Sequence, residues 1–349
     1  MFLASDNIGP VPDEIFQALA NANKGYQSSY GKDDVTKEVR TLVSEVFQAP
    51  EAAVYIVGTG TAANALALST LANPWDTIFC TPVAHLHEDE CNAPEFFSGG
   101  CKLTLVEGHD KITPKALHKA IQSQKRRSVH EPQRGPVSIT QLTEKGTTYS
   151  LQELKAIVDI AKSYELAVHM DGARFANAMV SLGCSAAEMS WKLGIDAVSF
   201  GCSKNGLMSA EVVVFFDPKH AWEFELRRKR SGHLLSKHRY LSAQIKGYLK
   251  NDLWLDLARK ANDYAAYLVG GLKQIEHCHF VYQPDANMIF VRFPRGLHQI
   301  AVKAGAYYDL GGQDLENGPQ EELLTARMVC DWSIGKGNID QFLAILKAG

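Results

Sequence analysis

The sequence predicts an α/β fold with a largely parallel, seven-stranded sheet, followed by a small C-terminal α+β domain. Between residues 53 and 216, short apolar runs alternate with helical patterns, which is typical of a parallel sheet covered by helices on both faces. After a long helical region at 217–275, the pattern changes to a different mixture of strands and helices. The 349 residues are ample for more than one domain. We expect a large domain at 1–249 and a small one at 250–349.

Hydrophobic periodicity and turn residues predict the elements of the large domain. The expected strands are Ala53–Val57, Thr77–Cys80, Lys102–Val106, Pro136–Thr140, Ala167–Met170, Ala197–Phe200 and Glu211–Phe216. The clearest helical patterns between them are Ala62–Leu71, Leu151–Tyr164 and Ser185–Leu193. Glu211–Phe216 follows the preceding strand after a short turn, so we expect it to run antiparallel to that strand. The polar stretch Gln122–Arg134 is interpreted as an exposed loop.

The remaining elements belong to the helical region and to the small domain. Helices are expected at Ala221–Lys237, Leu253–Leu272, His298–Ala304 and Ile339–Ala348, and strands at His279–Tyr282, Met288–Phe293 and Arg327–Trp332. We expect the N-terminal segment to pack near the small domain.

Composition limits the classes of partner and the compartment. A net charge of −3 gives no global sign of nucleic-acid binding, and we interpret the basic runs Lys125–Arg127 and Arg227–Arg230 as solvated surface. The seven cysteines form no CxxC pair, which favours reduced thiols in a cytoplasmic protein. The N-terminus lacks the basic and apolar regions of a signal peptide, and no apolar run is long enough to span a membrane. We therefore expect neither a membrane nor a nucleic-acid partner.

A glycine-rich turn follows the first strand and opens a helix. Gly58, Gly60 and the threonines around Thr61 allow the backbone to approach an anion, and the helix N-terminus supplies free N–H groups and a favourable dipole. The sequence predicts a phosphate site here. The same residues fit the Gly-x-Gly-x-x-Ala dinucleotide fingerprint, and a simple glycine turn with a threonine N-cap is the structural alternative.

A histidine cluster, His85-Leu-His87-Glu-Asp89-Glu90, follows the second strand. The spacing His-x-His-x-Asp resembles the start of a binuclear metal site, but residue 90 is not histidine and the following histidines lack ligand spacing. We therefore expect no metal. The competing use is an imidazole stacked on a planar cofactor, and an ordinary structural histidine is the alternative for either residue.

Asp171 and Lys204 lie at the ends of two core strands, where they contribute little to a core. They suit a Schiff-base cofactor that needs an amine on its aldehyde and a carboxylate on its ring nitrogen. Asp171 could instead cap a helix, and Lys204 could simply surface at a strand end. Ser203 could donate to a phosphate, and Arg174 could form a two-pronged contact with a carboxylate or phosphate.

Eight segments, spread over nearly the whole chain, form a distinctive set. They are Ala4–Asn7, Ser29–Asp34, Gly58–Asn64, His85 with Asp89–Cys91, Ser138–Gly146, His169–Arg174, Ser203–Gly206 and Ala326–Val329. The Asp-Gly-Ala-Arg and Ser-Lys-Asn-Gly pieces are quite specific in this order. The set resembles the threonine aldolases among the fold-type-I pyridoxal phosphate enzymes, especially their bacterial low-specificity branch.

The resemblance implies a role for each matching residue. Lys204 would bind pyridoxal 5′-phosphate as a Schiff base, with Asp171 on the pyridine nitrogen and His85 on the ring face. Gly60, Thr61 and Ser203 would hold the phosphate. Arg174 and Arg327 would bind the substrate carboxylate, with Ser5 near it. Tyr30 would line the pocket of an adjoining subunit, because family active sites lie at a dimer interface, often within a tetramer formed as a dimer of dimers.

The activity implied is cleavage of L-threonine, L-allo-threonine and related β-hydroxy-α-amino acids to glycine and an aldehyde. Many family members carry a second active-site histidine in the loop after the fourth strand, but here Gln141–Glu144 contains none. His85, His87 or a water could therefore deprotonate the substrate hydroxyl, and Lys237 could reach a neighbour's phosphate. Two alternatives stay open: a β-eliminating lyase on the same fold, which would share these residues, and a nicotinamide-dependent oxidoreductase.

Overall fold

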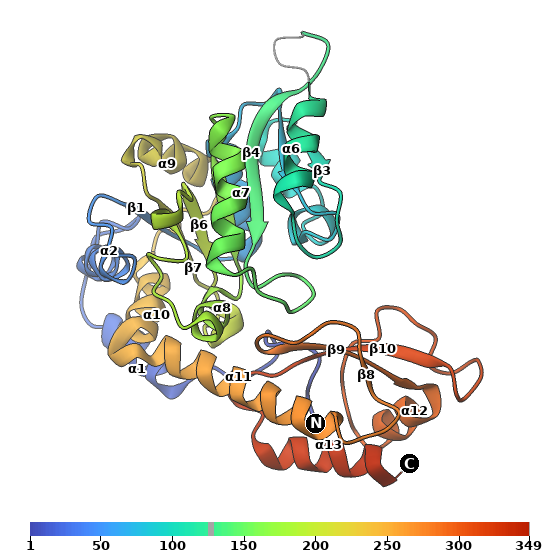
Figure 1. The fold of residues 1–349 in the computed structure, drawn as a ribbon. Coiled ribbons are helices and arrows are strands. Elements are labelled where there is room, and N and C mark those ends of the chain that lie inside the picture. The colour runs from blue at the N-terminus through green and yellow to red at the C-terminus, as the bar shows by residue number, and fades with distance from the viewer. Residues whose placement is uncertain (125–128, 349) are drawn as a thin grey trace.

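Two sheets organise residues 1–124 and 129–348, which are the residues that the computed structural model describes (Figure 1). The strands of the larger sheet are β1 (Ala53–Val57), β2 (Asp76–Cys80), β3 (Lys102–Leu105), β4 (Gln133–Thr140), β5 (Val168–Gly172), β6 (Ala197–Phe200) and β7 (Glu211–Phe215). Their spatial order is β1-β7-β6-β5-β4-β2-β3, and β7 runs antiparallel to both of its neighbours while the other pairs are parallel. The mostly parallel, seven-stranded sheet predicted from the sequence is confirmed.

Helices cover both faces of this sheet. They are α1 (Asp13–Ala22), α2 (Asp34–Val46), α3 (Gly60–Leu71), α4 (His85–Glu88), α5 (Ala93–Ser98), α6 (Pro114–Ser123), α7 (Leu151–Ser163), α8 (Phe175–Leu182), α9 (Ala221–Arg230) and α10 (Arg239–Leu249). Helix α3 is buried around almost its whole circumference because it packs between the sheet and helices α5 and α9. A helix that is apolar on every side needs such an environment. Its N-terminus is thereby held against the edge of the sheet.

The smaller sheet is antiparallel, in the order β10-β9-β8, and lies beside the larger one (Figure 1). Its elements are β8 (His279–Phe280), β9 (Met288–Pro294), β10 (Leu323–Val329), α12 (Arg295–Lys303) and α13 (Lys336–Ala348). Helix α11 (Leu253–Leu272) packs on both α8 and α13, so it joins the two parts. The N-terminus also reaches the small sheet: Leu3 is buried in its core, and Val329 N donates to Leu3 O at 2.7 Å. The expected boundary between residues 249 and 250 stays a prediction.

Several expected elements differ from the structure. The stretch Ser185–Leu193 forms turns and a short 3-10 helix, Trp191–Leu193, in place of the expected helix. The helix expected at Ala221–Lys237 ends at Arg230, since Gly232 adopts a φ of 82°. The last strand lies nearer the N-terminus than expected, at Leu323–Val329, where it pairs with β9 along its whole length.

The two basic runs have different outcomes. Residues 125–127 lie outside the described residues. Within the run 227–230, Arg228 is not a solvated surface residue: it is buried, and its guanidinium lies over the Tyr55 ring at 5.0 Å. The interpretation of the whole run as solvated surface was therefore wrong for Arg228. No helix in the described ranges is long and apolar enough to cross a bilayer.

The connections that follow β1, β2, β4, β5 and β6 emerge at the same edge of the large sheet, because these strands share one direction. Open α/β sheets bind ligands at this edge, where the carboxyl ends of the strands meet. Gly60, Thr61, His85, Arg174, Ser203 and Lys204 come from these connections, and Asp171 lies at the end of β5.

Candidate active site

A cavity of ≈ 280 Å³ lies at the carboxyl ends of β1, β5 and β6. Six of the predicted site residues line it: Gly60, Thr61, His85, Asp171, Ser203 and Lys204. They come from three connections of the sheet and from the end of β5, so the tertiary fold alone brings them together. We call this space the central cavity.

The N-terminus of α3 forms one wall of the central cavity. Thr59 caps the helix by accepting a hydrogen bond from Ala62 N at 3.1 Å, which leaves the N–H groups at the start of the helix directed at the cavity end. A Cβ placed on Gly60 would meet no atom within 4 Å, so space for an anion lies above it. A dinucleotide fold would place a parallel strand beside β1, but the partner of β1 is the antiparallel β7.

Asp171 is held by two hydrogen bonds. Its Oδ2 accepts from Asn64 Nδ2 at 2.8 Å, and its Oδ1 accepts from Ala173 N at 3.0 Å. Helix α8 begins at Phe175 with Arg174 in the N-cap position, so Asp171 is not the cap of this helix. The carboxylate is buried yet lines the cavity, which is the geometry that a charge-assisted contact with a ring nitrogen requires.

His85 and the residues after it point in different directions. His85 lines the cavity, whereas His87 and Asp89 are exposed, so the His-x-His-x-Asp motif does not converge on one point. Instead His85 Nδ1 lies 2.8 Å from Oε1 of the buried Glu90, and this hydrogen bond raises the pKa of His85. Among the described residues, no cluster of three or more His, Cys, Asp and Glu could hold a metal ion.

Lys204 lies in a short 3-10 turn, η2 (Ser203–Asn205), directly after β6. The turn is anchored because Asn205 Nδ2 donates to Tyr248 OH at 2.7 Å and to Trp254 O at 2.8 Å. Gly201 permits the approach to β5, since a Cβ there would lie 2.5 Å from Ala173 O. The glycine thus brings the lysine and aspartate connections into contact.

The substrate-side arginines differ in their surroundings. Arg174 is buried and forms a two-pronged ion pair with Asp6, Nε to Oδ2 at 2.7 Å and Nη2 to Oδ1 at 2.9 Å. Although burial raises the pKa of Asp6, the Arg174 guanidinium holds it below its ordinary value of 3.8. The fork predicted for Arg174 is therefore directed at a protein carboxylate, and its Nη1 makes no hydrogen bond to any described residue.

Arg327 and Ser5 lie where the N-terminal segment meets the small sheet. Arg327 Nη2 donates to Ala4 O at 3.3 Å and lies 3.4 Å from Asp309 Oδ2, while its buried Nε has no partner among the described residues. Ser5 Oγ accepts from Asn7 N at 3.1 Å, and Asn7 lines the central cavity.

Tyr30 lies away from the central cavity of its own chain, and it is not among the residues that line that cavity in the described structure. Its N–H donates to Ser236 O at 3.0 Å, and Lys229 Nζ lies 4.7 Å from the ring centroid. The side chain is 45% exposed.

Five polar residues of this region were given no role in the sequence analysis, although all but Glu211 lie in its distinctive segments: Asp6, Asn64, Glu90, Glu144 and Glu211. Asn64 bridges Asp171 and Glu90, and Glu211 Oε2 accepts from Cys202 N at 2.6 Å while the residue lines the cavity. Asn64 sits within a buried helix and Glu211 begins a buried strand. A polar side chain among buried apolar ones was the signal that could have found them.

Residues 3–294 match the model of the beta-eliminating lyase family. The low-specificity L-threonine aldolase of Pseudomonas aeruginosa is 37% identical over 94% of this chain and 92% of its own length. The low-specificity L-threonine aldolase of Pseudomonas sp. strain NCIMB 10558 is 36% identical over 99% of this chain and 96% of its own length. The solved structure of a Leishmania major threonine aldolase superposes with a TM-score of 0.91, at 24% identity over 99% of this chain and 98% of that one, and shows the same fold.

Proposed function

We propose that this chain cleaves β-hydroxy-α-amino acids such as L-threonine and L-allo-threonine. The chain belongs to the beta-eliminating lyase family and is similar over nearly its whole length to low-specificity L-threonine aldolases. The products are glycine and an aldehyde, and the cofactor is pyridoxal 5′-phosphate. The observation that carries the proposal is the meeting of Lys204, Asp171 and His85 in one cavity with the N-terminus of α3. Family membership gives no support to the nicotinamide-dependent alternative.

The donor set fits this cofactor. Lys204 supplies the amine for the aldehyde carbon, and the Asp171 carboxylate faces the cavity for a protonated ring nitrogen. The open space above Gly60, with Thr61 and Ser203 on its walls, suits a phosphate at the positive end of α3. His85 supplies a flat ring for one face. When bound, pyridoxal phosphate supplies an electron sink for the bond that breaks.

The arginines and the N-terminal segment orient the substrate. Among the described residues, Nε of Arg327 and Nη1 of Arg174 have no hydrogen-bond partner, which supports a role in binding the substrate carboxylate, with Ser5 beside them. Asp6 holds Arg174 in one orientation, so little rotamer freedom is lost when a carboxylate binds. A carboxylate fixed in this way sets which bond at Cα is aligned for cleavage.

A homo-oligomer in the cytoplasm completes the proposal. The exposed Tyr30 ring lies off its own cavity, which supports its use in the cavity of an adjoining subunit. Lys237 is exposed in the segment that contacts Tyr30, so it could approach a neighbour's phosphate from the same surface. We infer a dimer with shared active sites and a dimer of dimers as the full assembly.

Product analysis tests the reaction. Incubation with L-threonine or L-allo-threonine should yield acetaldehyde and glycine in equal amounts, without ammonia. The family's description as beta-eliminating lyases keeps a second candidate, in which Cα–H loss is followed by departure of the hydroxyl. The appearance of 2-oxobutyrate and ammonia would overturn the aldolase proposal and support that candidate.

A further inference from the structure

Glu144, on the loop after β4, lies beside the central cavity, although it is not among the described residues that line it. Its Oε1 accepts a hydrogen bond from His85 N at 3.3 Å, so the carboxylate lies at the start of α4 beside the cavity-lining histidine. Its charge also interacts with those of Asp171, Lys204 and Arg174. The carboxylate is therefore close to the residues proposed to hold the cofactor and the substrate. Its Oε2 makes no hydrogen bond to any described residue.

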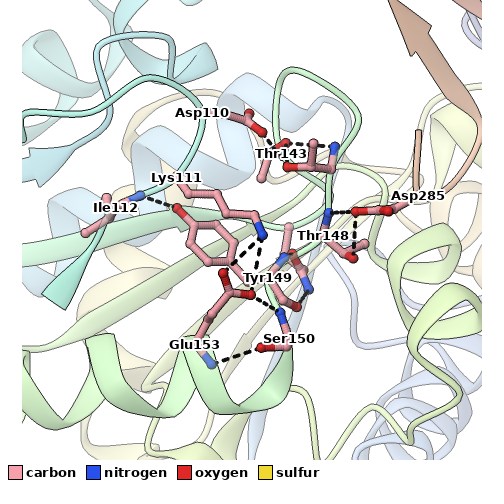
Figure 2. Close-up of polar contacts among 11 residues, drawn as sticks. Asp110, Lys111, Ile112, Thr143, Thr148, Tyr149, Ser150, Glu153 and Asp285 are labelled. Carbon is pink, nitrogen blue, oxygen red and sulfur yellow. Dashed lines mark hydrogen bonds and ion pairs between the residues drawn. The ribbon is translucent and has the colours of Figure 1, made fainter. Parts of the chain in front are cut away.

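The loop that carries Glu144, residues 141–150, is held from several sides (Figure 2). Across its base, Gln141 Nε2 donates to Tyr149 O at 2.9 Å and Tyr149 N donates to Gln141 Oε1 at 3.0 Å. Ile112 N donates to the Tyr149 hydroxyl, and Thr148 N donates to Asp285 Oδ2 at 2.8 Å, as Figure 2 shows. These bonds fix the loop to the β3–α6 connection and to the segment before β9.

The tip of the loop is equally constrained. Thr143 N donates to Thr147 O at 2.9 Å, which closes a tight turn around Glu144. Gly146 has a φ of 82°, and a Cβ on it would lie 2.6 Å from Met288 O at the start of β9. The loop therefore packs against the small sheet at a distance that only glycine allows. A carboxylate on such a support is pre-positioned.

Two other titratable residues of the cavity, Asp171 and His85, already have hydrogen-bond partners. Asp171 accepts from Asn64 and from Ala173 N, and His85 Nδ1 is bound to Glu90. On the basis of the proposed function, we infer that Glu144 is the base that takes the proton from the substrate β-hydroxyl.

The atoms and electrons of this step balance. The O–H bond breaks and its proton passes to Glu144 Oε2. The electron pair of that bond forms the second C–O bond of the aldehyde, and pyridoxal phosphate, when bound, would accept the pair of the Cα–Cβ bond. A proton then returns to Cα to give glycine, and Glu144 is restored when it releases its own proton to water.

The surroundings of Glu144 make its carboxylate a stronger base than an ordinary glutamate. Burial and the neighbouring Asp171 raise the pKa of Glu144, and Lys204, His85 and Arg174 oppose the rise without cancelling it. A carboxylate with a raised pKa binds a proton more strongly than an ordinary one. The ionised form is the base, so cleavage should increase as the pH rises through the pKa of Glu144.

Capping of α4 is the competing role, since Glu144 bonds to His85 N. The substitution Glu144→Gln separates the two roles, because the amide oxygen keeps the acceptor while the base is lost. We expect kcat for L-threonine cleavage to fall about 100-fold or more, the size typical of a lost general base. The increase of kcat with pH that reflects ionisation of Glu144 should disappear in this variant. Cofactor affinity and the melting temperature of the cofactor-free protein should be unchanged.

Exchange of the glycine α-proton in D₂O provides the decisive comparison, because glycine has no β-hydroxyl. E144Q should exchange glycine at close to the wild-type rate while cleaving threonine poorly. Glu144→Asp, with a carboxylate on a shorter arm, should recover part of the activity. Glu107→Gln is the matched control: this glutamate is exposed, pairs with Lys119 on the surface and does not line the cavity, so E107Q should cleave threonine normally.

Three outcomes would overturn the assignment. If E144Q cleaves threonine as the wild type does, Glu144 is not the base. If cleavage, glycine exchange and cofactor affinity fall together in both E144Q and E144D, its role is to shape the site. A wild-type protein that binds the cofactor and exchanges glycine but releases no acetaldehyde would overturn the proposed function itself, and the role of Glu144 with it.

Discussion

The cofactor side and the substrate side of the active site are built differently. At the edge of the large sheet, a continuous chain of hydrogen bonds runs from Asp171 through Asn64 and Glu90 to His85. Near the small sheet, Arg327 is 38% exposed, has weak contacts and carries a buried Nε without a partner among the described residues. Polar groups bonded to one another keep their positions without a ligand. An unpartnered donor gains a partner only when a ligand arrives. The first side is thus preformed, and on the proposed function Arg327 of the second side gains its partner when the substrate binds.

The largest expected effect tests the cofactor side. Lys204→Ala should abolish covalent cofactor binding and lower threonine cleavage by at least about 1,000-fold, as removal of an attacking group does. Borohydride reduction of the yellow wild-type protein should tag the peptide that contains Lys204, as peptide mapping would reveal. Lys303→Ala, on the exposed end of α12, is the control. A tag on another lysine would refute the assignment.

The ion pair between Asp6 and Arg174 should affect stability most. Asp6→Asn leaves a buried guanidinium uncompensated, which should lower the free energy of unfolding by about 3–5 kcal/mol. Urea denaturation measures this change. Asp34→Asn, which breaks an exposed pair with Lys37, should cost less than about 1 kcal/mol. Equal losses in both variants would show that the Asp6 pair is no more important than a surface pair.

This pair also predicts a pH dependence. The folded state lowers the pKa of Asp6 below 3.8, so its stabilising contribution is present above that pH and is lost as the pH falls through the lowered pKa. The difference in unfolding free energy between wild type and Asp6→Asn should therefore shrink in strong acid. A constant difference down to low pH would contradict the shift.

On the substrate side, Arg327→Lys should leave the bound cofactor and the melting temperature unchanged. The KM for L-threonine should rise by about 10-fold to 100-fold, because lysine cannot reproduce a two-pronged contact. Steady-state kinetics and the absorbance of the bound cofactor measure the two effects. Unchanged kinetics would show that Arg327 has only a structural role, through its contacts with Ala4 and Asp309.

The smallest expected effect concerns metal. Because His87 and Asp89 are exposed and point away from the cavity-lining His85, dialysis against a chelator should change the cleavage rate by less than about twofold. Elemental analysis for zinc accompanies the assay. Activity lost to the chelator and restored by zinc would reverse this interpretation.

Local sequence patterns predicted much of the fold. Strands Ala53–Val57 and Ala197–Phe200 and helix Leu253–Leu272 lie where hydrophobic periodicity placed them. One miss, the helix that ends at Arg230, has a local cause that periodicity ignores: a turn with a positive φ at Gly232 competes with the helix. Helix patterns survive such competition only when tertiary packing favours them.

The sequence by itself determined the α/β class and the residues that end its parallel strands, because apolar periodicity is local and parallel strands share one edge. Lys204, Asp171 and His85 could be named for that reason. Only the tertiary structure decided which charges meet. Asp6 and Arg174 are 168 residues apart, and Glu144 reaches His85 from a loop 59 residues away. Such contacts depend on the path of the whole chain, which no short stretch of sequence records.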